Sequence, residues 1–285
     1  MIAGKSHPSM KQITLVSLYG EKEDNLVKLI GRCQKDVAES VTEPDGSTCF
    51  TPHDIRQIHA TIIGLERRIG SSADNASFLK HREREVEMDF EGFLRYLRGC
   101  GHFPLEVQIG GFGEREYPFT SGNPITGEKM RPYDRSFSLQ GDKVVMMGWP
   151  IRGRPLLGPP ATPEGIVQES RTYPPTLDTV RHAAQRFGIL HGYHRKIDDV
   201  DNDLFFRIGL IDTKKLTPAL KGRLDNRISK IRRDLSSQEA LLSQVRLDDI
   251  CIAAYEDDRL PLSSTQTWSL LDARVTGGFV RGLFR

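Results

Sequence analysis

The chain has 285 residues, of which 38% are hydrophobic and 27% charged, proportions typical of a globular protein with a substantial core. Its formal net charge of +2 gives no overall basic field that would favour duplex DNA, although a local basic patch stays open. No apolar run approaches the roughly 20 residues that span a bilayer, and the first ten residues lack a hydrophobic signal core. We therefore expect a cytoplasmic protein without membrane contacts.

The four cysteines are scattered along the chain without paired spacing: Cys33, Cys49, Cys100 and Cys251. Disulfide frameworks and zinc sites place cysteines at characteristic short intervals. The pattern favours reduced, mostly structural thiols in a cytoplasm.

Hydrophobic spacing divides residues 11–150 into alternating strands and helices. In the segment that begins at Asp24 or Asn25, apolar side chains recur at helical intervals from Leu26 to Val37. The predicted order is a strand over 11–19, this helix, a turn at 44–47, a strand over 58–65, a helix over 89–100, a strand over 105–109, a hairpin or loop over 114–135 and a strand pair within 137–150.

The second half of the chain repeats this alternation after a proline-rich segment at 150–175, which is predicted to be a linker. The predicted elements are a helix over 177–191, strands over 204–212, 250–255 and 268–271, and a helix over 217–235. Each half supplies strands with helices that can cover one face. The pattern predicts an α+β fold with two similar lobes, 11–150 and 176–275.

One predicted strand carries a histidine and a threonine two positions apart, in Ile58-His59-Ala60-Thr61-Ile62. Because side chains alternate along a strand, His59 and Thr61 share one face. An imidazole that titrates near neutrality then lies beside a hydroxyl that can donate to a phosphate oxygen. This pair suits phosphodiester chemistry, and the competing interpretation is a structural histidine whose hydrogen bonds are satisfied by its neighbours.

This pentapeptide resembles the motif of the two-histidine (2H) phosphoesterase superfamily, the RNA-ligase-like cyclic phosphodiesterases. Members have two lobes related by pseudo-twofold symmetry around a cleft, and each lobe contributes one strand with an apolar residue, His, any residue, Thr or Ser, and an apolar residue. The resemblance implies one two-lobed domain over 1–285, with antiparallel sheets around a central cleft and helices on the outer faces.

The resemblance also implies the roles of the site residues. His59 would be the general base or acid, and Thr61 would hydrogen-bond a non-bridging phosphate oxygen. The ligand would be a phosphoester of a nucleotide or RNA end, such as a cyclic phosphate. The family's acid–base chemistry needs no metal ion and no cofactor.

The second copy of the motif is expected on the strand over 204–211, where the sequence departs from the family pattern. Aligning His59-Ala60-Thr61 with Arg207-Ile208-Gly209 replaces His by Arg and Thr by Gly. A competing alignment puts Leu204 and Phe206 at the motif positions. Alternation favours the first, because Leu204 and Phe206 belong to an apolar face that leaves Phe205, Arg207 and Gly209 for the cleft.

An arginine can hold a phosphate from the opposite lobe but cannot give up a proton near pH 7. The chain is therefore predicted to be either a hydrolase with one intact motif or a non-catalytic member that binds a ligand or a protein in the same cleft. His191 and His194 are candidate substitutes for the missing proton donor. The acidic run 199–203 lacks the glycine and glutamate of a calcium loop, which favours a solvated turn.

Overall fold

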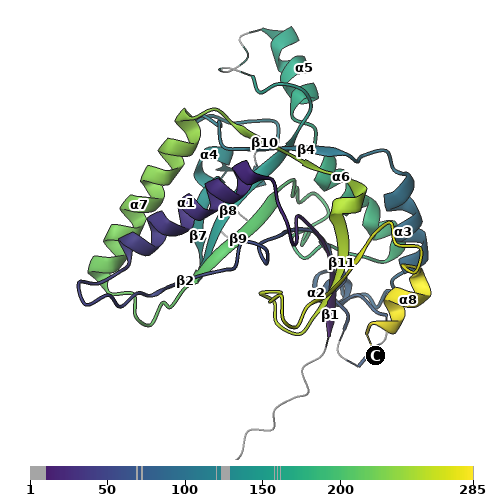
Figure 1. Cartoon of the computed structure of the whole chain (residues 1–285). Helices are drawn as coiled ribbons and strands as arrows, with labels where there is room; N and C mark the ends of the chain where they lie inside the picture. The colour runs from purple at the N-terminus through teal and green to yellow at the C-terminus, as the bar shows by residue number, and fades with distance from the viewer. Residues whose placement is uncertain are drawn as a thin grey trace, which may run out of the picture.

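Ten antiparallel strands form one sheet in the computed structural model of the chain (Figure 1). The structure describes residues 11–284, except 69, 72, 120, 123–128, 157, 159 and 161. The strands of the sheet are β1 (Gln12–Ser17), β2 (Phe50–Pro52), β3 (Ala60–Gly64), β4 (Leu105–Ile109), β7 (Phe137–Gln140), β8 (Lys143–Ile151), β9 (Leu204–Ile211), β10 (Leu241–Val245), β11 (Ile250–Tyr255) and β12 (Gln266–Ser269). Strands β5 (Ser121–Gly122) and β6 (Lys129–Met130) form a separate two-stranded ribbon.

The order across the sheet is β10-β4-β8-β9-β3-β1-β11-β12, with β2 paired to β9 and β7 paired to β8. This confirms the predicted mixture of helices with an antiparallel sheet. Two separate sheets were expected, but β3 pairs with β9 through Ala60 and Phe206 and joins all ten strands into one. Strands from 11–150 and from 176–275 contribute to both ends of the sheet, so the predicted ranges do not correspond to separate groups of strands.

Helices surround the sheet, and α1 (Asp24–Ser40) and α7 (Pro218–Ser237) run side by side across it (Figure 1). Apolar residues from Leu26 to Val37 and from Leu220 to Leu235 enter the main core together with β-strand residues such as Phe206. The other helices are α2 (Ala76–Arg82), α3 (Phe90–Gly99), α4 (Pro132–Arg135), α5 (Pro163–Thr172), α6 (Thr176–Ala184) and α8 (Gly277–Gly282). Among the residues that the structure describes, no helix is both long and apolar enough to cross a bilayer.

The proline-rich segment contains helix α5, which projects from the top of the molecule in Figure 1 and was not predicted. The Thr162 hydroxyl caps it by accepting from the Gly165 N–H, and Pro163 occupies its first turn, where proline is tolerated. The predicted helix over 177–191 is shorter than expected. A 3₁₀ turn follows α6 and ends at Gly188, whose φ of +70° is left-handed.

Each of the two central strands contains a β-bulge directly after a residue predicted to act on phosphate. In β3, Thr61 lies opposite Val16 and Ile63 lies opposite Leu15, so Ile62 is the extra residue. In β9, Arg207 lies opposite Val145 and Gly209 opposite Val144, so Ile208 is the extra residue. A single inserted residue reverses the alternation of faces beyond it.

The bulge in β9 corrects the prediction that Gly209 faces the cleft. Gly209 instead lies on the core side, where a Cβ atom would come within 2.4 Å of Phe50 Cε2 and 2.7 Å of the Thr51 carbonyl oxygen. Only glycine fits at this approach of β2 to β9. Strict alternation was the wrong assumption, because it allowed for no bulge.

We predict that Gly209→Thr destabilises the protein by about 1–3 kcal/mol or more, because its side chain must displace Phe50 or the backbone of β2. Urea denaturation gives the free energy of unfolding. Gly222→Ala in α7 is the matched control, since a Cβ there meets nothing within 4 Å and should stabilise the helix by about 0.5–1 kcal/mol. Equal stability of Gly209→Thr and the wild type would contradict this packing.

Candidate functional site

A cavity of about 830 Å³ lies at the junction of β3 and β9. Met147 and Phe205 line it, whereas their neighbours Met146 and Phe206 are buried in the main core with α1 and α7. The cavity therefore opens on the opposite face of the sheet. His59, Thr61 and Arg207 all line it, so Arg207 shares one concave surface with two residues that lie far from it in sequence.

His59 directly precedes β3 and is held by a backbone hydrogen bond. Its Nδ1–H donates to the Gln57 carbonyl oxygen at 2.9 Å, because a carbonyl can only accept. This tautomer leaves the lone pair on Nε2, to which no described group hydrogen-bonds. Burial lowers the pKa of His59 to about 4, and Arg207 adds to the effect. At pH 7 the ring is neutral, and Nε2 can accept a proton.

Thr61 stands on the same side of β3 as His59 and is half-buried. Its backbone carbonyl accepts from Arg181 Nη2 at 2.9 Å, which fixes the strand beneath the hydroxyl. The hydroxyl can donate to an anion in the cavity or accept from one of its protons.

Arg207 reaches the cavity from β9 with a side chain that is 19% exposed. Its Nη1 lies 3.2 Å from Asp258 Oδ2 and 3.3 Å from the Asp258 carbonyl oxygen. The Asp258 side chain is 68% exposed, and such a solvated ion pair contributes little stability. The anionic phosphate group of a ligand in the cavity could therefore compete for the guanidinium, which suits forked binding of phosphate oxygens.

Arg181, on α6, is a cavity-lining residue that the sequence analysis missed. It is 2% exposed, and its N–H groups donate to the carbonyl oxygens of Thr61, Ile62, Asp201 and Asp203 at 2.9–3.1 Å. Nη1 also lies 3.3 Å from Asp201 Oδ1. The guanidinium therefore stabilises the fold by connecting these backbone and side-chain acceptors. A charged residue among the buried positions Leu177, Val180 and Ala184 of one helix was the available signal.

His191 lines the cavity, and its Nε2–H donates to Asp201 Oδ2 at 2.8 Å. Burial lowers the pKa of His191 to about 4, with Arg181 adding to the effect. Burial alone would raise the pKa of Asp201, but Arg181 and His191 hold it well below its usual range. His191 is consequently neutral at pH 7, and His194 is fully buried away from the cavity lining. Neither residue presents an imidazolium to a ligand there.

Further charged and polar side chains line the cavity. Arg135 pairs with the carboxylate of Asp203, which also accepts from Trp149 Nε1 at 2.7 Å. Lys143 and Tyr193 face the cavity, and burial raises the pKa of Tyr193, which keeps its hydroxyl protonated at neutral pH. These residues come from α4, from the hairpin of β7 and β8 and from the loop before β9, so no sequence motif links them to His59.

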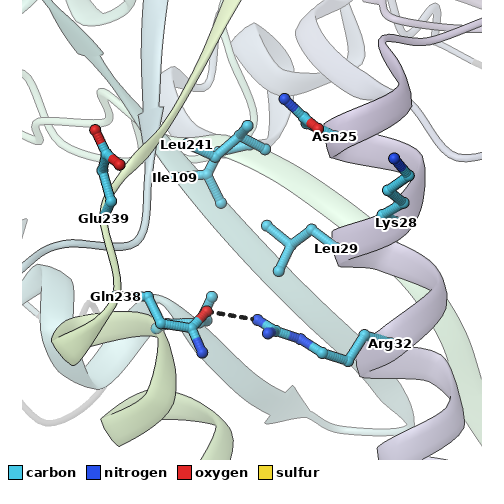
Figure 2. Close-up of a pocket in the computed structure, with 9 residues that line it drawn as sticks. Asn25, Lys28, Leu29, Arg32, Ile109, Gln238, Glu239 and Leu241 are labelled. Carbon is cyan, nitrogen blue, oxygen red and sulfur yellow. Dashed lines mark hydrogen bonds between the residues drawn. The ribbon is translucent and has the colours of Figure 1, made fainter.

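A second, smaller cavity of about 270 Å³ lies between α1 and β10 (Figure 2). Leu29, Ile109 and Leu241 form its apolar part, and Arg32 donates to Gln238 Oε1 at 2.9 Å across its edge. None of the residues predicted to act on phosphate lines this cavity.

One group of potential metal ligands occurs among the described residues, formed by Asp178, His182 and His194. It lies outside the lining of the large cavity, although the Asp201 N–H donates to Asp178 Oδ1 at 2.8 Å and connects the two regions.

Comparisons with family models, curated proteins and solved structures found no match to this chain.

We predict that Arg181→Lys destabilises the protein by about 2–6 kcal/mol. An ammonium has three donors in place of five, so at least two of the five acceptors around Arg181, which are four carbonyl groups and the Asp201 carboxylate, lose their contact at about 1–3 kcal/mol each. Arg186→Lys, an exposed substitution two residues beyond the end of α6, should stay within about 0.5 kcal/mol of the wild type. Denaturation curves of the two variants compare them directly, and equal values would contradict the role of Arg181.

Proposed function

We propose that the large cavity binds a phosphoester of a nucleotide or RNA end, such as a cyclic phosphate, and that His59 acts in its hydrolysis. The observation that carries the proposal is the shared location of His59, Thr61 and Arg207 on one cavity wall. An imidazole with an accepting nitrogen, a hydroxyl and a guanidinium together match the needs of a phosphodiester. The proposed chemistry is metal-independent.

The hydrolytic step follows from the tautomer of His59. Nε2 removes a proton from a water molecule as its oxygen attacks phosphorus, and the bond from phosphorus to the leaving oxygen breaks. Arg207 and Thr61 bind the non-bridging oxygens, whose negative charge grows during the attack. The leaving oxygen then takes up a proton from solvent water, and His59 releases its own to solvent, so that no net proton is lost.

Two features of the sheet support a pseudo-symmetric relation between β3 and β9. The pair Ala60–Phe206 joins the strands, and the extra residues Ile62 and Ile208 follow it at equal distances. If Ala60 corresponds to Phe206 and Ile62 to Ile208, then Thr61 corresponds to Arg207, and His59 corresponds to Phe205. We propose this alignment in place of the one that matches His59 with Arg207.

Phe205 favours a second candidate function, a non-catalytic module that binds its ligand in the same cavity. In the proposed alignment a phenyl ring stands where the second imidazole would protonate the leaving oxygen, and a phenyl ring carries no transferable proton. General acid–base assistance contributes about 10²–10⁴-fold per group. The proposed enzyme is accordingly slow, and binding measurements have to be separated from turnover.

We predict that the protein binds 2′,3′-cyclic nucleotides and that Arg207→Met weakens the affinity about 10–100-fold, because a charged hydrogen bond contributes about 1.5–3 kcal/mol. Asp258→Asn should tighten binding, because it removes the competing carboxylate. Isothermal titration calorimetry measures both. The matched control is Arg223→Met, which removes a guanidinium from α7 that pairs with Glu43. It should leave the affinity for the nucleotide unchanged. Absence of binding at millimolar nucleotide, or equal affinity of Arg207→Met and wild type, contradicts the proposal.

We predict that Phe205→His raises the hydrolysis of cyclic phosphodiesters about 10²-fold, because it supplies the absent proton donor. The gain should disappear when His59→Asn is added, since the two imidazoles act on opposite oxygens of one phosphate. Steady-state kinetics with a 2′,3′-cyclic nucleotide measure the effect.

Two controls accompany this variant. Phe205→Leu keeps an apolar side chain and should show no gain, and Arg207→His tests the rejected alignment. A gain from Arg207→His but none from Phe205→His would overturn the alignment.

Wild-type kcat/KM should fall as the pH drops through about 4, because protonation removes the Nε2 lone pair of His59.

A further inference from the structure

Asp178, His182 and His194 bring three ligating side chains together beside the cavity wall. Asp178 and His182 are four residues apart on α6 and therefore share one face of the helix. His194 belongs to the loop between Gly188 and β9, which also carries His191 and Asp201. The His194 side chain is completely buried, whereas His182 is 35% exposed and Asp178 14% exposed.

The donor atoms of these side chains have the spacing of a metal site. One ligand atom from each residue lies within 4.8 Å of the others. Asp178 Oδ1 is 3.0 Å from His194 Nε2. His182 Nδ1 is 3.2 Å from Asp178 Oδ2 and 3.0 Å from the Asp178 carbonyl oxygen, a hydrogen bond that a metal at this nitrogen would replace. Tetrahedral zinc with bonds of about 2.0–2.2 Å places its ligands roughly 3.3 Å apart. A small movement of side chains would suffice to admit the ion.

The cluster also has suitable charge and orientation. A carboxylate and two imidazoles are side chains that zinc commonly takes as ligands. The Asp201 N–H donates to Oδ1 at 2.8 Å, the kind of contact that orients a metal-binding carboxylate. The two imidazole rings lie beside one another, with centroids 4.1 Å apart.

We propose that Asp178, His182 and His194 bind one Zn²⁺ ion, with a water molecule from the exposed side of His182 as fourth ligand. The ion would fasten the loop that carries His191 and Asp201 to α6. Binding displaces the protons that His182 and His194 share with Asp178, because only deprotonated nitrogen ligates metal. The site is independent of the phosphoester chemistry in the cavity.

The test uses the full chain after dialysis against a chelator, titrated with ZnCl₂ in a calorimeter. We expect one equivalent of Zn²⁺ to bind, and Co²⁺ in its place to give the strong visible absorption of tetrahedral coordination. Zn²⁺ should also raise the melting temperature, because it binds the folded state preferentially. His182→Gln and Asp178→Asn should each weaken the affinity at least tenfold.

The control variant is His102→Gln, which removes a histidine two residues from Cys100, where zinc could bind adventitiously. It should bind Zn²⁺ as the wild type does. His182 is partly exposed, so His182→Gln is expected to fold, and circular dichroism checks this. The proposal is overturned if the wild type binds no stoichiometric Zn²⁺, or if His182→Gln and His102→Gln bind it equally well.

Discussion

The cavity wall depends on the buried guanidinium of Arg181. It donates to carbonyl groups of β3 on one side and of the 201–203 segment on the other, and it pairs with the Asp201 carboxylate. Unpaired carbonyls at such depth would each cost about 1–3 kcal/mol. The guanidinium of Arg181 thus connects β3, the strand that carries Thr61, with the segment that carries Asp201 and Asp203. More than 130 residues separate this strand and this segment in the sequence.

The second constraint is the sparse pairing between β3 and β9. One registered pair, Ala60 with Phe206, joins them, and each strand then bulges. The bulge exposes the Ile208 carbonyl, which accepts from the His53 N–H at 3.0 Å and from Gln34 Nε2 at 2.9 Å. These contacts satisfy the backbone at the break in the ladder. The same irregularity leaves Arg207 facing the cavity and turns Gly209 to the core.

The cavity combines fixed charges with neutral imidazoles. Burial and nearby guanidinium groups keep His59 and His191 uncharged at pH 7, so the positive charge at the cavity comes from arginine and lysine side chains such as Arg207 and Lys143. A neutral histidine beside a cation can accept a proton without competing for an anion. This division of roles supports the proposed recognition of a phosphoester.

The hydrophobic periodicity of the sequence was sufficient to predict the elements in which it is strong. Helices α1, α3 and α7 and the strands at 12–17, 105–109 and 204–211 lie close to their predicted ranges. The sequence pattern also placed His59 and Thr61 on one face, since alternation needs only neighbouring residues. The orientation of Gly209, the junction of the two central strands and the position of Arg181 were beyond that reasoning. They depend on a bulge, on one long-range pair and on carbonyl groups far away in sequence, and such interactions exist only once the chain has folded.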